Sequence, residues 1–361
     1  MKEWMLANMK TAKFWQKKEG KVQLILILFF AVNIFASSQL FAQAGYKEYK
    51  KAQEFVSTGD LEKALQSLNG AIKKNPSYAE AYNFRGIVKK SLGRTQESIA
   101  DFSQALKYSP NSTTIYNNRG ISLYLVGRYQ EALEDFNESL AIDNLNAEIW
   151  ANRARTLTAL GLTKDAIDSY NNAIGKEAYD PELYKLRGDL YAKLGFYGDA
   201  LADFEKALEL RDSYALCYLS RADVYRRLGL YAEAIEDVNV AIKLIPSNPE
   251  GYYYRGLILI SRGGYPQAIR NFDYALSQDP NYHLAYHARG VAHDSLAQYQ
   301  MSISDYTKAI ELRANAWESY FNRGLAYIHL NELVKAKKDI KTALDLNPTS
   351  VEAREVLGKI Q

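Results

Sequence analysis

The sequence predicts an all-α protein built from tandem helix pairs, an α-solenoid. A period of 34 residues runs from Gly45 to Ser350 without insertion or deletion. Within each period, apolar and small residues recur every three or four positions, the spacing of amphipathic helices. Glycine and proline fall at two fixed places in the period, where a helix would end. A repeat of this length indicates helical hairpins that stack on their neighbours.

Three parts follow from this period. Residues 1–44 precede the repeats, residues 45–350 form nine of them, and residues 351–361 begin another first helix that we expect to cap the open end of the stack. The repeats are 45–78, 79–112, 113–146, 147–180, 181–214, 215–248, 249–282, 283–316 and 317–350.

The leading residues have the pattern of a secretory signal peptide. Several lysines precede the apolar run Val22–Phe35, and small residues stand at Ala42 and Ala44. We expect cleavage between Ala44 and Gly45. If the apolar run is continued through Ala42, it is long enough for an uncleaved membrane anchor, which is the alternative. Both interpretations export the repeats, to the periplasm or envelope or, alternatively, as a secreted protein.

Each repeat, numbered 1 to 34, is expected to contain two helices. Positions 4, 8 and 11 define the apolar side of the first helix, and positions 20, 21, 24, 27 and 28 that of the second. Glycine at position 15 in seven repeats, from Gly59 to Gly263, lets the first helix end in a left-handed conformation. Positions 8 and 20 hold only Gly, Ala or Ser, so the two helices are predicted to cross closely. Proline at position 32 stops the second helix in five repeats.

These residues closely resemble the tetratricopeptide repeat. Its signature has an aromatic residue at positions 4, 11 and 24, Gly or Ala at 8, Ala at 20 and 27, and Pro at 32. The resemblance covers residues 45–350 and implies a right-handed superhelix whose first helices line a concave groove through positions 2, 5, 9, 12 and 13. The proline is missing at four places: Asn144, Ala178, Asp212 and Ala314.

Position 7 is arginine in eight of the nine repeats, and position 23 is aspartate in six of those eight. A charge at a helix interface needs a partner, because an unpaired half-buried ion costs several kcal/mol. We therefore interpret these residues as structural ion pairs rather than as a ladder of arginines offered to an acidic ligand, which is the alternative. Ser169 and Asn271 replace the aspartate in repeats 4 and 7. The predicted pairs include Arg119 with Asp135, Arg187 with Asp203, and Arg221 with Asp237.

The resemblance places the candidate binding residues on the concave wall. A mixed-charge middle with apolar ends fits a peptide or helical segment of a partner protein, so we expect an exported protein–protein interaction scaffold that could belong to an envelope assembly. The alternative is a carrier that binds a glycan or cell-wall fragment through groove tyrosines such as Tyr124 and Tyr253. The expected partner-binding residues are Asn117, Ile121, Tyr124, Arg155, Lys185, Asp189, Arg226, Tyr253, Leu257, His287, Phe321 and Leu325.

Other functions are disfavoured. The formal charge of +3 falls to −1 without residues 1–44, which leaves no basic footprint for nucleic acid. His283, His287 and Asp294 lie on one face of the same expected helix, and His329 lies in the next repeat. We expect no metal site, because Asp294 is almost two helical turns from His287, too far to share an ion. No phosphate-binding or nucleophile motif is present, so neither an enzyme nor a cofactor is predicted. Contact with a membrane is expected only if the N-terminal segment is retained.

Overall fold

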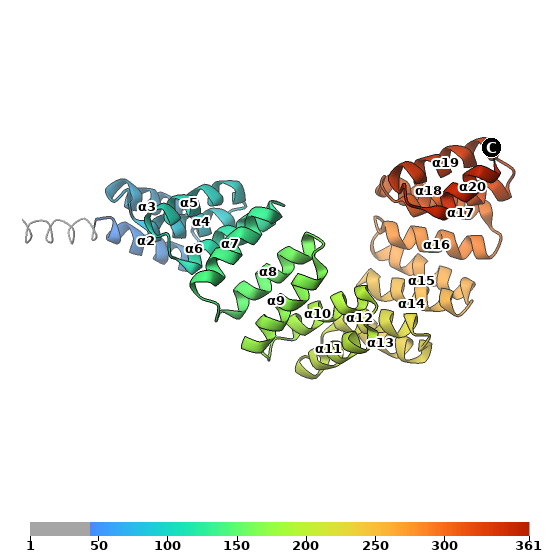
Figure 1. Ribbon diagram of the computed structural model, residues 1–361, viewed down its shortest axis with the longest axis horizontal. Coiled ribbons are helices and arrows are strands. Elements are labelled where there is room, and N and C mark those ends of the chain that lie inside the picture. Colours follow the sequence, from blue (N-terminus) through green and yellow to red (C-terminus); the bar gives the residue numbers. More distant parts are fainter. Residues whose placement is uncertain (1–43, 361) are drawn as a thin grey trace, which may run out of the picture. The chain divides into compact units, whose positions relative to one another are not determined.

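The structure, a computed structural model, describes residues 44–360 (Figure 1). Within that range all regular secondary structure is helical, in 19 helices from α2 to α20, and no strand is present. The all-α fold class predicted from the period is therefore confirmed. The predicted signal peptide lies, but for Ala44, outside the described residues.

The chain divides into two compact segments after Lys176. The N-terminal segment holds four repeats and the C-terminal segment holds five, followed by a short last helix. The helix pairs of the first segment are α2 (Tyr46–Ser57) and α3 (Leu61–Lys74), α4 (Ala79–Ser91) and α5 (Thr95–Tyr108), α6 (Thr113–Leu125) and α7 (Tyr129–Ile142), and α8 (Ala147–Ala159) and α9 (Thr163–Lys176). Those of the second are α10 (Pro181–Leu194) and α11 (Tyr197–Leu210), α12 (Ala215–Arg227) and α13 (Tyr231–Leu244), α14 (Pro249–Ser261) and α15 (Tyr265–Gln278), α16 (His283–Ser295) and α17 (Tyr299–Leu312), and α18 (Trp317–His329) and α19 (Leu333–Leu346), with α20 (Val351–Lys359) last.

A left-handed residue joins the two helices of every repeat. The seven glycines at position 15 have φ between 76° and 82°, a region that residues with a Cβ rarely adopt. Repeats 8 and 9 keep the same turn without glycine, because Ala297 and Asn331 take φ of 57° and 59°. The turn geometry is therefore the same in all nine repeats, although repeats 8 and 9 have a residue other than glycine at position 15.

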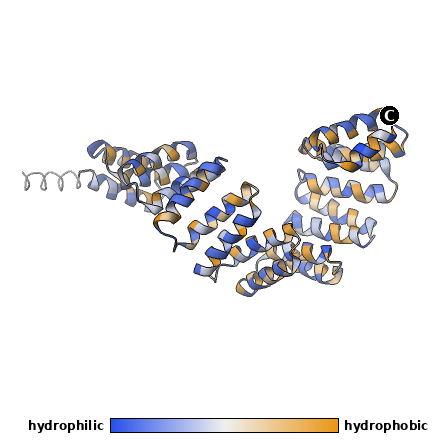
Figure 2. Ribbon diagram, in the orientation of Figure 1, coloured by the Kyte–Doolittle hydropathy of each residue, from blue (hydrophilic) through white to orange (hydrophobic). Residues whose placement is uncertain are grey.

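Each repeat buries one face of both helices. Figure 2 shows hydrophobic and hydrophilic residues interleaved along the helices, as expected for amphipathic helices that pack on one side. The closest crossing lies at position 8, where a Cβ added to Gly86 would stand 2.8 Å from Cζ of the fully buried Phe102. Phe272 of repeat 7 and Ala288 of repeat 8 are buried in one cluster, and the partly buried Leu257 and Ile260 of repeat 7 pack against it.

Cys217 in the first turn of α12 is completely buried, and its Sγ lies 3.6 Å from the backbone oxygen of Phe204. Burial raises the pKa of this thiol to about 12. Because only the thiolate reacts, we expect thiol reagents at pH 8 to label the folded chain at least ~100-fold more slowly than the urea-unfolded chain. An aromatic disulfide reagent releases a coloured thiolate as it reacts, and the rise in absorbance measures both rates. Equal rates would contradict the burial of Cys217.

Candidate functional site

Six repeats contain an arginine–aspartate pair that joins their two helices. In repeat 6, Arg221 Nε and Nη2 donate to the two carboxylate oxygens of Asp237, both at 2.7 Å. This two-point geometry is the strongest that arginine offers a carboxylate. In all six pairs the aspartate side chain is at most 8% exposed. The pairs are Arg85 with Asp101, Arg119 with Asp135, Arg187 with Asp203, Arg221 with Asp237, Arg289 with Asp305, and Arg323 with Asp339.

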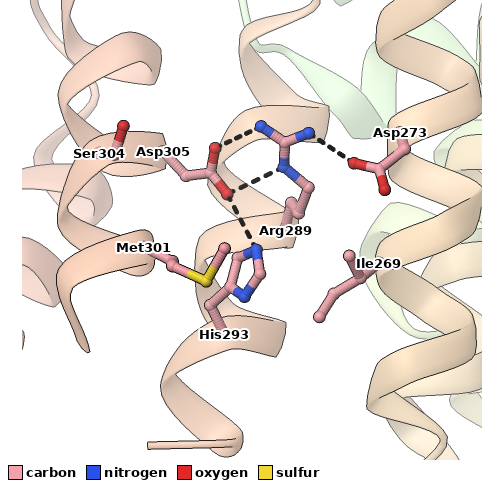
Figure 3. A pocket seen from close by; sticks show the side chains of 7 residues that line it. All are labelled: Ile269, Asp273, Arg289, His293, Met301, Ser304 and Asp305. Carbon is pink, nitrogen blue, oxygen red and sulfur yellow. Dashed lines mark hydrogen bonds and ion pairs between the residues drawn. The ribbon is translucent and has the colours of Figure 1, made fainter. Parts of the chain in front are cut away.

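Four of these arginines, Arg85, Arg119, Arg289 and Arg323, also reach the preceding repeat. Figure 3 shows Arg289 of α16 between Asp305 of α17 and Asp273 of α15, and its Nη1 donates to Asp273 at 2.6 Å. Arg119 and Arg323 donate in the same way to hydroxyl groups on the preceding second helix. The aromatic residue at position 4 lies against the guanidinium in all eight repeats, with centroid distances of 5.3 to 5.9 Å. The guanidinium groups of these arginines are therefore engaged in contacts within the scaffold.

Arg153 and Arg255 lack the carboxylate that completes the other six arginines. Arg153 donates to Ser169 Oγ at 2.5 Å and to Asn137 Oδ1 at 2.7 Å. Arg255 donates to Asn271 Oδ1 at 2.7 Å. Burial lowers the pKa of Arg153, as expected for a half-buried cation that is hydrogen-bonded but not neutralised.

Asn271→Asp should complete the missing pair of repeat 7. The change replaces a neutral hydrogen bond to Arg255 with a charge-assisted one, so we expect the free energy of unfolding to rise by about 1 kcal/mol. The shift of the urea midpoint measures it, and Asn281→Asp in the exposed turn after α15 is the matched control. A lower midpoint for Asn271→Asp alone would show that this site does not accept a carboxylate.

The first helices of successive repeats adjoin one another, as α14, α16 and α18 do in the C-terminal segment. The predicted groove positions lie along these junctions: His287 Nδ1 of α16 is 2.8 Å from Ser319 Oγ of α18. We call positions 2, 5, 9, 12 and 13 of these three helices the C-terminal wall. Its members are Glu250, Tyr253, Leu257, Ile260, Ser261, Leu284, His287, Val291, Asp294, Ser295, Glu318, Phe321, Leu325, Ile328 and His329.

On α6 and α8 of the N-terminal segment the predicted residues are half-buried and polar contacts connect them. Asn117 Oδ1 accepts from Asn152 at 3.1 Å, and Arg155 donates to the same Asn152 at 3.2 Å. A second amide pair joins Asn118 to Asn83 of α4 at 3.0 Å. We call positions 2, 5, 9, 12 and 13 of α4, α6 and α8 the N-terminal wall; Ile121 and Tyr124 are among its residues.

On α10 and α12 the predicted charges are mostly paired with each other. Lys185 Nζ lies 2.7 Å from Asp189, and Arg226 lies 2.8 Å from Asp223. A pocket of about 260 Å³ opens between α10, α12 and α14, lined by Asp189, Ala192, Lys193, Ser220, Asp223, Arg227 and Tyr254. Ser220 and Tyr254 stand at position 6, which is not among the expected groove positions. The asparagines that recur at position 6 of other repeats are a signal that could have revealed this position.

The two tyrosines proposed for sugar stacking pack against other rings of the chain. Tyr253 lies 5.1 Å from Tyr282 and 6.1 Å from Phe272 between ring centroids, and Tyr124 lies 5.3 Å from Tyr129. Burial raises the pKa of Tyr253 to about 12. This arrangement favours a packing role for both rings and does not support the glycan alternative.

A pocket of about 400 Å³ adjoins the C-terminal wall beside His283, His287 and Trp317. Burial lowers the pKa of His287, and burial together with Arg313 lowers the pKa of His283, so both imidazoles are neutral at pH 7. Among residues 44–360 no group of three or more His, Cys, Asp or Glu side chains is placed to hold a metal ion. None of the described helices is long and apolar enough to cross a membrane.

Comparison with known proteins agrees with this geometry. Models described as tetratricopeptide repeat or TPR repeat match residues 52–93, 79–112, 114–144, 185–249, 283–315 and 317–350. A curated relative, an uncharacterized protein of Methanocaldococcus jannaschii, is 42% identical over 50 residues, which is 14% of this chain and 58% of that protein.

Two crystal structures share the fold. The APC/C hetero-tetramer Cut9–Hcn1 matches with a TM-score of 0.59 and 16% identity, over 83% of this chain and 59% of that chain. Yeast Tom70 matches with a TM-score of 0.50 and 12% identity, over 88% of this chain and 95% of that chain. The repeat models, the helix pairs and these structures together show that the chain belongs to the tetratricopeptide repeat family.

Proposed function

We propose that this protein is an interaction scaffold that holds a peptide or helical segment of another protein along its first helices. Members of the family are typically scaffolds for protein–protein interaction. The C-terminal wall is the surface that we assign to apolar anchors of the partner.

The observation that carries this proposal is the apolar character of the C-terminal wall. Leu257, Val291, Leu325 and Phe321 are all half-buried, so part of each side chain is exposed to solvent. Burying apolar surface gains roughly 25 cal/mol per Å², so a row of partly exposed aliphatic groups favours a partner that covers it. Anchors of this kind dominate the energetics of protein interfaces.

The N-terminal wall suits the backbone of an extended peptide. An asparagine amide has two N–H donors and a carbonyl with two lone pairs. Each contact between Asn117 and Asn152, or between Asn83 and Asn118, uses one donor and one acceptor. The remaining groups can hydrogen-bond an extended peptide, whose own N–H and C=O groups are unpaired.

The scaffold is proposed to act outside the cytoplasm, in the periplasm or envelope or after secretion. The support is the basic, apolar and small-residue pattern of residues 1–44. Mass spectrometry of the mature N-terminus tests this location. A first residue of Gly45 is expected, and a retained leader would favour the membrane-anchored form.

Photo-cross-linking in living cells tests the binding function. A photoreactive residue at Leu325 on the C-terminal wall should capture a discrete protein, joined through one contiguous segment that peptide mapping identifies. The control is the same residue at Val334 of α19, which is 87% exposed and lies outside both walls. Equal capture at both positions, or capture of a species that is not protein, would overturn the proposal.

A further inference from the structure

The C-terminal wall is acidic as well as apolar. Its fifteen positions include three carboxylates, Glu250, Asp294 and Glu318, and no lysine or arginine. None of the three forms an ion pair with another described residue of the chain. The wall therefore offers negative charge that the scaffold itself leaves unmatched.

Asp294 is the most unusual of the three, because it stands in the middle of the wall among aliphatic residues. Its position on the two neighbouring first helices is occupied by Ile260 and Ile328. One carboxylate oxygen, Oδ2, accepts a hydrogen bond of 2.7 Å from the hydroxyl of the buried Tyr306. The other, Oδ1, is shielded from solvent and has no hydrogen-bond partner among the described residues. A carboxylate in such surroundings is costly unless a positive charge approaches it.

The charged groups around Asp294 do not provide that compensation. Arg289 and Arg323, on the same and the next first helix, are held by Asp305 and Asp339 on the second helices. His287 belongs to the same wall, but its burial keeps the imidazole neutral at pH 7. Asp294 is itself only half-buried, but its Oδ1 is shielded from solvent, so a cation on the wall reaches this oxygen only if the side chain or its neighbours shift when the segment binds.

We propose that the segment bound on the C-terminal wall carries a lysine or arginine between apolar anchors, and that this cation lies beside Asp294. The inference rests on the proposed function and adds the chemistry of the partner. Leu257 and Leu325 flank the acidic centre at position 9 of α14 and α18, so the apolar anchors lie on either side of the cation. Charge complementarity of this kind sets partner choice and register, and Asp294 disfavours segments that are wholly apolar or acidic.

Selection from random peptides tests the proposal without knowledge of the natural partner. A phage library of random 15-residue peptides is selected on the immobilised full chain, on Asp294→Asn, and on Asp345→Asn as a matched control. Asp345 is exposed on α19, outside the wall, so its substitution makes the same charge change without touching the proposed site. Helical circular dichroism and the melting curve establish that the three proteins are folded alike.

Peptides selected on the wild type and on Asp345→Asn should be enriched in Lys or Arg flanked by apolar residues. A selected peptide should bind Asp294→Asn about tenfold more weakly, and replacing its basic residue with norleucine should remove the difference between the two proteins.

Two failures are distinguishable. If no peptide is enriched on the wild type, both the proposed function and this inference are overturned. If peptides are enriched and are displaced by Leu325→Glu, but they lack basic residues or bind Asp294→Asn equally well, the binding function stands and only the role of Asp294 is rejected.

Discussion

Gly256→Val is expected to lower the free energy of unfolding of the C-terminal segment by about 3 kcal/mol. A Cβ on Gly256 would lie 2.7 Å from Cζ of Phe272 and 2.9 Å from Cδ1, well inside normal contact distance. Phe272 is completely buried, so its ring cannot move away without displacing the core. Valine adds two further methyl groups at a crossing between α14 and α15 that accommodates none.

Gly198→Val is the control for this prediction, because nothing lies within 4 Å of a Cβ added to Gly198 on α11. We expect it to change stability by no more than about 0.5 kcal/mol. Urea unfolding followed by circular dichroism compares the two variants. Since stacked repeats need not unfold in one step, hydrogen exchange in α14 and α15 provides the local reading. Similar, small effects at both glycines would mean that the crossing is looser than the structure shows.

Asp237→Ala is expected to cost about 2–3 kcal/mol. It removes the carboxylate that receives two hydrogen bonds from Arg221, whose side chain is only 18% exposed. The guanidinium would then remain partly buried beside Tyr218 and Tyr225, with its charge uncompensated.

The loss should be visible at Cys217, in the same repeat as Arg221 and Asp237. Easier local opening predicts roughly 30- to 150-fold faster labelling of this thiol, the equivalent of 2–3 kcal/mol. Asp345→Ala on the exposed face of α19 serves as the control and should leave the labelling rate unchanged. The double variant Asp237→Ala, Arg221→Leu should recover part of the stability, because it removes the stranded charge. If binding of a selected peptide falls while the labelling rate stays at the wild-type value, the arginines are ligand groups after all.

Together, these predictions distinguish the residues of each repeat that stabilise the stack from the residues that bind a partner. The arginine–aspartate pairs and the close crossings at position 8 join the first helix of each repeat to its second helix. The walls use the adjoining side of the first helices, at positions 2, 5, 9, 12 and 13. Substitutions that do not touch across the two parts should act independently, whereas those in contact, such as Tyr253 and Leu257 against Phe272, should be coupled.

The fold could be predicted from the sequence because every repeat has the same residue requirements at the same positions. Position 15 needs a left-handed residue, and position 8 needs a side chain no larger than a methyl group, so Gly59 and Gly86 carry their structural meaning in their spacing. The pairing of Arg221 with Asp237 was also predictable, because a charge placed at a helix interface requires an opposite charge within reach.

The sequence by itself thus determined the helix pairs, their close crossings and the partners of most arginines, since these are local requirements repeated at a fixed period. Only the tertiary structure decided that Arg289 also holds Asp273 of the preceding repeat, and that one oxygen of Asp294 is left without a partner. Both depend on which side chains of neighbouring repeats come within hydrogen-bonding distance, and a one-dimensional period does not contain those distances.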